Sequence, residues 1–146
     1  MRNTAEGIST TRFPVVKAIA YGVVIWVVGF IWGSLVFMTP SLKSVPPIPY
    51  VSSNPAISLP IIALWLPLAY LLARNFLKNS RTPEADGVML GIAFSEVNFV
   101  LDIIVLVILL NAGIGFFAAA SVWIAYAMLF VIAWLTGRSL AKALPD

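Results

Sequence analysis

Two carboxylic acids and an amide lie inside a long apolar segment of the chain. Residues 91–110 read GIAFSEVNFVLDIIVLVILL, and Glu96, Asn98 and Asp102 interrupt an otherwise mostly hydrophobic run. An ionised side chain at the centre of a bilayer costs roughly 2.5–3.5 kcal/mol, so acids at this depth usually mark an ion or proton site. The residues predicted to form such a substrate, ion or proton site are Ser95, Glu96, Asn98 and Asp102.

The two acids occupy different faces of the predicted helix. At 100° per residue, Gly91, Ser95, Asn98 and Asp102 cover an arc of roughly 60°. Glu96 lies about 120° from Asp102 and roughly 9 Å away along the axis. The two carboxyl groups therefore cannot pair on their own helix, and no other acid lies deep in an apolar segment. This pattern argues against a catalytic carboxylate dyad, and we expect no enzyme activity.

The sequence offers neither acid a deep positive charge. No Lys or Arg occurs between Lys43 and Arg74, or between Arg81 and Arg138. The carboxyl groups could be protonated or face water in a cavity, which would describe a proton-coupled site. Alternatively, a cationic substrate, a metal ion or a partner helix could supply the missing charge. A structural interpretation also stays open, in which the polar stripe only forms hydrogen bonds that hold the helices together.

The composition removes several other classes of chemistry. The chain has no Cys and no His, so it lacks disulfides, thiolate metal sites and the usual ligand of haem and catalytic zinc. We therefore predict neither a cofactor nor a metal site. The net charge is +3, but the basic residues form no continuous face, so nucleic acid is not an expected partner.

The composition and the long apolar segments that contain these residues predict transmembrane helices. Of 146 residues, 61% are hydrophobic and 10% charged, whereas a soluble domain has roughly 25% charged residues. Four segments reach the length of about 20 residues that a spanning helix needs: 14–38, 57–77, 87–110 and 114–136. We predict an all-α integral membrane protein with these four helices in an antiparallel bundle over 14–137. The first segment is too long for a signal peptide and is expected to be retained.

Charge at the ends of the segments predicts the orientation. Eight of the nine basic residues lie on one side, and Lys43 alone lies on the other. Since Lys and Arg concentrate in cytoplasmic loops, the tails 1–13 and 138–146 should both be cytoplasmic. We expect a multi-pass protein of a bacterial-type inner membrane. The eight residues are Arg2, Arg12, Lys17, Arg74, Lys78, Arg81, Arg138 and Lys142.

Small residues and aromatics suggest how the helices meet. Gly22, Gly29 and Gly33 fall on one side of the first segment, where they could pack inside the bundle or form a homodimer seam. Trp26 and Tyr126 lie at the centres of their segments and need a partner for N–H or O–H, which an acidic neighbour would provide. A second small-residue stripe is formed by Ala118, Ser121 and Ala125.

Prolines mark the second segment and the loop before it. Pro67 lies near the middle of the segment, where it should kink the helix and free the carbonyl of Ala63. The loop 39–56 contains five prolines and should be extended. It could act as a lid or a docking strap over the outer face, or be a passive surface loop.

These features favour a small membrane transporter or channel. It would handle a cation or a proton-coupled solute through the acidic site, with Trp26, Tyr126 and Pro67 as possible supporting residues. One four-helix bundle rarely encloses a path, so a homo-oligomer in the lipid bilayer is expected. The alternative is an accessory or assembly subunit of a larger membrane complex, which would use the same acids for contacts between helices.

Overall fold

The protein is an all-helical bundle. The computed structural model describes residues 13–38, 55–111, 113–118 and 120–143, and no strand occurs among them. A π-helix continues the third α-helix, and a short 3-10 helix precedes the fourth. The elements are α1 (Val15–Met38), α2 (Pro55–Leu77), α3 (Pro83–Leu101), η3 (Asp102–Leu109), η4 (Ile114–Ala118) and α4 (Ala120–Ala141). The predicted all-helical fold with four α-helices is confirmed.

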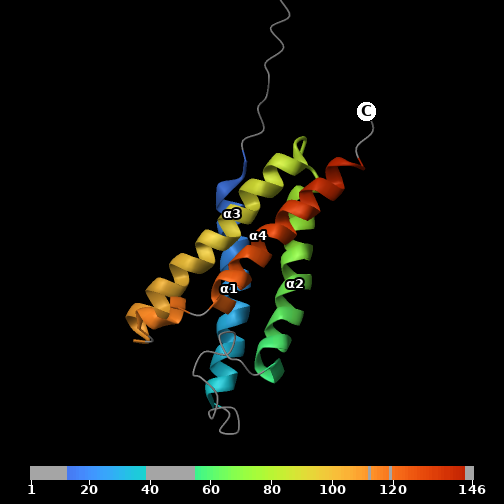
Figure 1. The fold of residues 1–146 in the computed structure, drawn as a ribbon. Helices are drawn as coiled ribbons and strands as arrows, with labels where there is room; N and C mark the ends of the chain where they lie inside the picture. The colour runs from blue at the N-terminus through green and yellow to red at the C-terminus, as the bar shows by residue number, and fades with distance from the viewer. Residues whose placement is uncertain (1–12, 39–54, 112, 119, 144–146) are drawn as a thin grey trace, which may run out of the picture.

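Successive helices run in opposite directions. Figure 1 shows α1 descending, α2 returning, α3 descending with η3 at its lower end, and α4 rising to the C-terminal end. The proline-rich loop predicted to be a lid, a strap or a passive segment lies mostly outside the described residues. So does the N-terminal tail up to residue 12.

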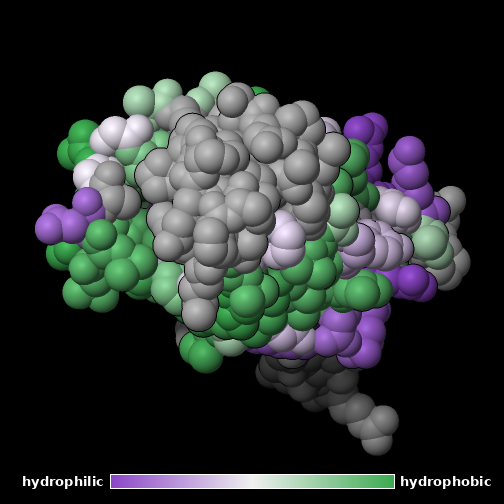
Figure 2. Space-filling view, turned by 90° about the horizontal axis from the view of Figure 1, so that it is seen from below, coloured by the Kyte–Doolittle hydropathy of each residue, from purple (hydrophilic) through white to green (hydrophobic). Residues whose placement is uncertain are grey.

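Among the residues that the structure describes, three helices are long and apolar enough to cross a membrane. The qualifying segments are Val15–Trp32, Pro83–Leu109 and Val122–Ala141, whereas the corresponding part of α2, Ala63–Leu77, is shorter. Large hydrophobic side chains cover the outside of the bundle; Val16 and Ile114 are each 82% exposed. Figure 2 shows hydrophobic residues over much of the visible face, with hydrophilic residues gathered mainly at its right-hand edge. This surface suits lipid far better than water.

The ends of two helices differ from the sequence prediction. The third begins at Pro83, because proline is favoured in the first helical turn. Glu84 and Asp86 lie in the same turn, where acidic side chains interact favourably with the helix dipole. The fourth predicted segment, 114–136, is not one helix: η4 is separated from α4, and α4 continues to Ala141. Its last turn carries Arg138, a favourable charge near a helix C-terminus.

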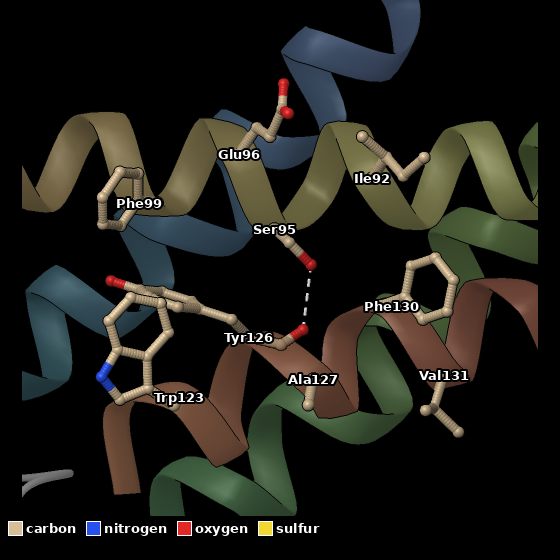
Figure 3. Close-up of a pocket in the computed structure, with 9 residues that line it drawn as sticks. All are labelled: Ile92, Ser95, Glu96, Phe99, Trp123, Tyr126, Ala127, Phe130 and Val131. Atoms are coloured by element: carbon tan, nitrogen blue, oxygen red, sulfur yellow. Dashed lines mark hydrogen bonds between the residues drawn. The ribbon is translucent and has the colours of Figure 1, made fainter. Parts of the chain in front are cut away.

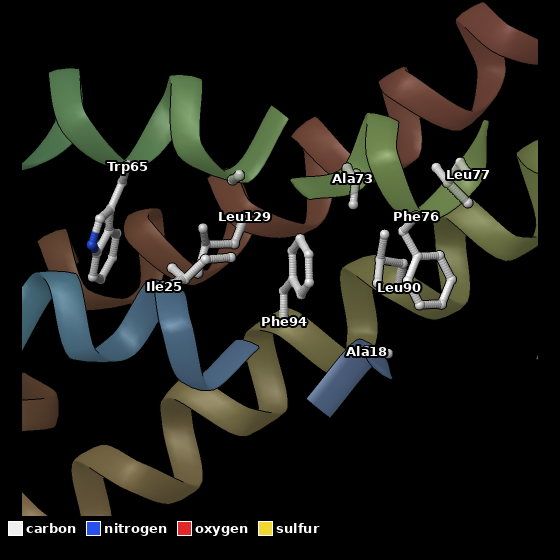
Figure 4. Close-up of a cluster of buried hydrophobic side chains, with 11 residues drawn as sticks. Ala18, Ile25, Trp65, Ala73, Phe76, Leu77, Leu90, Phe94 and Leu129 are labelled. Atoms are coloured by element: carbon white, nitrogen blue, oxygen red, sulfur yellow. The ribbon is translucent and has the colours of Figure 1, made fainter. Parts of the chain in front are cut away.

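A hydrophobic core joins the four α-helices. Figure 4 shows Ile25 of α1, Trp65 of α2, Phe94 of α3 and Leu129 of α4 among the side chains that fill the interior. Between these large groups, Ala18, Ala69, Ala73 and Ala133 are fully buried. Small side chains at these positions let the backbones approach closely.

The predicted glycine seam of α1 packs inside the chain. A Cβ added at Gly22 would lie 2.9 Å from Val97 Cβ of α3, and one added at Gly29 would overlap the Trp65 ring of α2. These two glycines therefore fit the intramolecular alternative. The surroundings of Gly33 lie outside the described residues.

The second predicted small-residue stripe does not form a continuous seam. Ala118 is exposed in η4, whereas Ala125 is half-buried against the core. The side chain of Ser121 is outside the described part of the chain. We therefore assign no packing role to this stripe as a whole.

A second glycine seam joins α3 to α4. A Cβ at Gly91 would lie 2.8 Å from the Phe130 carbonyl oxygen, and one at Gly87 would lie 2.9 Å from the Ala133 carbonyl oxygen. Gly137 faces the backbone of Pro83 and Gly87. The spacings Gly87-x-x-x-Gly91 and Ala133-x-x-x-Gly137 carry the small-xxx-small signal that would have predicted this contact.

Candidate functional site

Asp102 lies buried where α3 passes into η3. Only 3% of the residue is exposed. The Trp26 indole N–H donates to Asp102 Oδ1 at 2.8 Å, and the Tyr126 hydroxyl donates to Asp102 Oδ2 at 2.5 Å. The expectation that an acidic neighbour would provide partners for Trp26 and Tyr126 is confirmed.

These two bonds connect three helices through one carboxyl group. Trp26 comes from α1 and Tyr126 from α4, and both donors are electrically neutral. Asp102 therefore links both α1 and α4 to the third helix.

Asn98 and Ser95 continue the same inward-facing stripe. Asn98 is fully buried, and its Nδ2 group donates to the Phe94 carbonyl at 2.8 Å and the Gly22 carbonyl at 3.3 Å. Ser95 Oγ donates to the Tyr126 carbonyl at 2.9 Å. Ser95, Asn98 and Asp102 thus bond to the neighbouring helices, which is the geometry expected of groups that hold a bundle together.

The backbone changes its winding at the same place. From Asp102 to Leu109 the chain forms a π-helix, and Leu110 N bonds to Val105 O at 2.9 Å. Each backbone hydrogen bond in this winding spans one residue more than in an α-helix, and short π segments in other proteins are often found at functional sites. The sequence carried no signal for it, because the segment is uniformly apolar after Asp102.

Glu96 lies on a different face from Asp102, as the helical wheel predicts. It is exposed, and it occupies the midpoint of the apolar segment Pro83–Leu109. Figure 3 shows Ser95 pointing from α3 towards α4, while Glu96 points away from α4. The structure therefore brings Ser95, Asn98 and Asp102 into the interior and leaves Glu96 on the surface.

Glu96 stands at the rim of an open groove between α3 and α4. The groove has a volume of about 470 Å³ and is almost entirely apolar. Two hydrogen-bonding groups at its floor, Ser95 Oγ and the Tyr126 hydroxyl, already donate within the protein. The lining residues are Ile92, Ser95, Glu96, Phe99, Trp123, Tyr126, Ala127, Phe130 and Val131.

Aromatic rings at one end of the groove fix one another. The Phe99 and Trp123 rings each lie edge-on to the Tyr126 ring, with centroids 6.0 Å away. Trp123 Nε1 also donates to the Phe117 carbonyl at 2.9 Å. The sequence did not identify Phe99, Trp123 or Phe130 as lining residues. The position of Phe99, three residues after Glu96, was the available signal.

Pro67 does not belong to this site. It lies on α2, is exposed, and is not among the residues that line the groove. The described Asp and Glu residues include no group of three close enough to hold a metal ion.

Replacing Tyr126 with phenylalanine should lower the free energy of unfolding by about 1 kcal/mol, because one donor to buried Asp102 is lost. Denaturation in mixed SDS micelles would measure the change. Tyr70→Phe is the matched control, since Tyr70 is exposed on α2 and its substitution should be neutral. Equal effects of the two substitutions would contradict a stabilising bond at Asp102.

Comparison with known proteins gives no relative to reason from. No family model matches the chain, and no curated protein or solved structure matches it.

Proposed function

We propose that the chain is a four-span membrane transporter or channel-forming protein for a cation or a proton-coupled solute. In this proposal α2 crosses the bilayer with the three longer apolar segments, and both termini face the cytoplasm of a bacterial-type inner membrane. The alternating directions of the helices and the one-sided distribution of Lys and Arg support this topology.

The observation that carries the proposal is the position of Glu96. Its carboxyl group lies on the outer surface of the bundle, at the midpoint of an apolar segment long enough to span a membrane. In lipid, an ionised group there costs roughly 2.5–3.5 kcal/mol. A proton or a bound cation at Glu96 would remove that cost, and exchange between the two would couple their movements.

The buried stripe has a separate role in the same proposal. Asp102 already accepts hydrogen bonds from α1 and α4, and Asn98 donates to the α1 backbone. These groups position the helices that flank Glu96. Ser95 belongs to both regions, because it lines the groove and bonds to the Tyr126 carbonyl.

An oligomer completes the proposed path. The groove is open on one side, so a second surface must face it to exclude lipid from a moving ion. We propose that a second copy provides that surface, with the two Glu96 side chains lining one path.

Flux into liposomes tests this function. With a proton gradient imposed, the wild-type protein should accelerate cation or proton movement, and Glu96→Gln should reduce the rate by about tenfold or more. Glu84→Gln is the matched control, because Glu84 is an exposed acid in the first turn of the same helix. Full flux in Glu96→Gln would rule out the proposed role of Glu96.

The same exposed acid also favours an accessory subunit as a second candidate. A basic residue on a partner helix could pair with Glu96 across the apolar face of α3. Gentle purification separates the candidates: a transporter should form a defined homo-oligomer, whereas a subunit should copurify with other chains in fixed ratio. Loss of those chains on Glu96→Gln substitution would support the subunit.

A further inference from the structure

We propose that the groove between α3 and α4 binds a hydrophobic organic cation carrying one positive charge. The apolar body would lie in the groove, and the charged centre would lie beside Glu96. This inference rests on the proposed transport function and names the class of substrate.

The size of the groove suits a small organic molecule. Its volume of about 470 Å³ falls within the range of roughly 300–1,000 Å³ that is usual for small-molecule sites. Its walls come from two helices held together by backbone contacts at Gly87 and Gly91. The groove is therefore formed before any ligand arrives, which limits the ordering that binding requires.

The lining chemistry selects an organic cation over an inorganic one. Inorganic cations such as Mg²⁺ and Ca²⁺ need several oxygen ligands, whereas the lining residues include one carboxylate, which points away from α4, and two hydroxyl groups that already donate elsewhere. Phe99, Trp123 and Phe130 instead present aromatic surface. Aromatic faces attract organic cations through the ring quadrupole, and they also contact an apolar body.

The sign of the charge follows from the position of Glu96. It is the one charged residue among the lining residues, and its side chain is exposed at the rim. In Figure 3 its carboxyl group points away from α4, so the flexible side chain would turn towards the groove to meet a cationic centre while the rest of the ligand stays buried. A neutral ligand would leave the carboxylate uncompensated, and an anion would be repelled.

Direct binding to the full-length protein tests the inference. Tetraphenylphosphonium would be titrated into the protein in phosphatidylcholine nanodiscs and bound probe measured by equilibrium dialysis, with triphenylphosphine oxide as the neutral probe. Wild type should bind the cation saturably and the neutral probe at least about tenfold more weakly. Glu96→Gln should weaken cation binding about tenfold, Trp123→Ala should weaken it severalfold, and Glu84→Gln should leave it unchanged.

Several results would overturn the inference. These are an absence of saturable binding to wild type, undiminished binding to Glu96→Gln, or competition by Na⁺ or Mg²⁺ at constant ionic strength. If binding fails while proton flux still depends on Glu96, the inference is wrong but the proposed function stands. If binding succeeds without flux, the ligand class is supported and the transport function is wrong.

Discussion

Substituting Gly137 with leucine should prevent α3 and α4 from packing together and lower the free energy of unfolding by about 3 kcal/mol or more. Even a single Cβ at this position would overlap the Pro83 carbonyl oxygen and lie 3.0 Å from Gly87 Cα. Both contacts are with backbone, which cannot rotate away as a flexible side chain can. Leucine adds three further carbon atoms to the same space, so the two helices would have to separate.

Unfolding in detergent micelles, followed by circular dichroism, would measure this effect. Gly115→Ala is the control, because a Cβ at Gly115 meets nothing within 4 Å. That substitution should change stability by no more than about 0.5 kcal/mol. If Gly137→Leu is as stable as Gly115→Ala, the close contact between α3 and α4 is not the arrangement present in the membrane.

Asp102→Ala should lower the free energy of unfolding by about 2 kcal/mol. The substitution leaves the Trp26 indole N–H and the Tyr126 hydroxyl without their shared acceptor inside the bundle. Each unsatisfied buried donor costs about 1–3 kcal/mol in soluble proteins, and interhelical bonds in membranes average nearer 0.6 kcal/mol. The expected loss of about 2 kcal/mol assigns about 1 kcal/mol, a value between these two figures, to each of the two lost bonds.

A double-mutant cycle isolates the Tyr126 bond from other effects of the substitution. Asp102→Ala, Tyr126→Phe and the double variant would be unfolded under the same conditions. The coupling energy should be about 1 kcal/mol, because the Tyr126 hydroxyl no longer forms a stabilising hydrogen bond once its acceptor Asp102 is replaced. Strict additivity of the two substitutions would show that they do not interact.

The sequence predicted the arrangement of the polar residues because helical periodicity determines it. Ser95, Asn98 and Asp102 recur every three or four residues and so share a face, which the structure turns inward. Glu96 falls between them in the sequence and must point elsewhere. The need of Trp26 and Tyr126 for an acidic partner followed from their polar atoms and their depth in the predicted spans.

Other features depended on interactions that no single segment contains. The change to a π-helix at Asp102 occurs in a run of aliphatic residues that is equally compatible with an α-helix. The groove lies between α3 and α4, which approach closely at Gly87 and Gly91, and its lining residues come from both helices. The small-xxx-small spacing of these two glycines could have predicted their contact with α4, whereas no sequence pattern predicted the groove.

The roles of the two acids can be separated by measuring flux and stability on the same pair of variants. Glu96→Gln should lose flux while keeping the wild-type free energy of unfolding, because its side chain is exposed on the bundle. Asp102→Asn should lower that free energy by about 1 kcal/mol, since one acceptor oxygen is replaced, while retaining measurable flux. Full flux in Glu96→Gln, with unchanged stability in Asp102→Asn, would contradict both assignments.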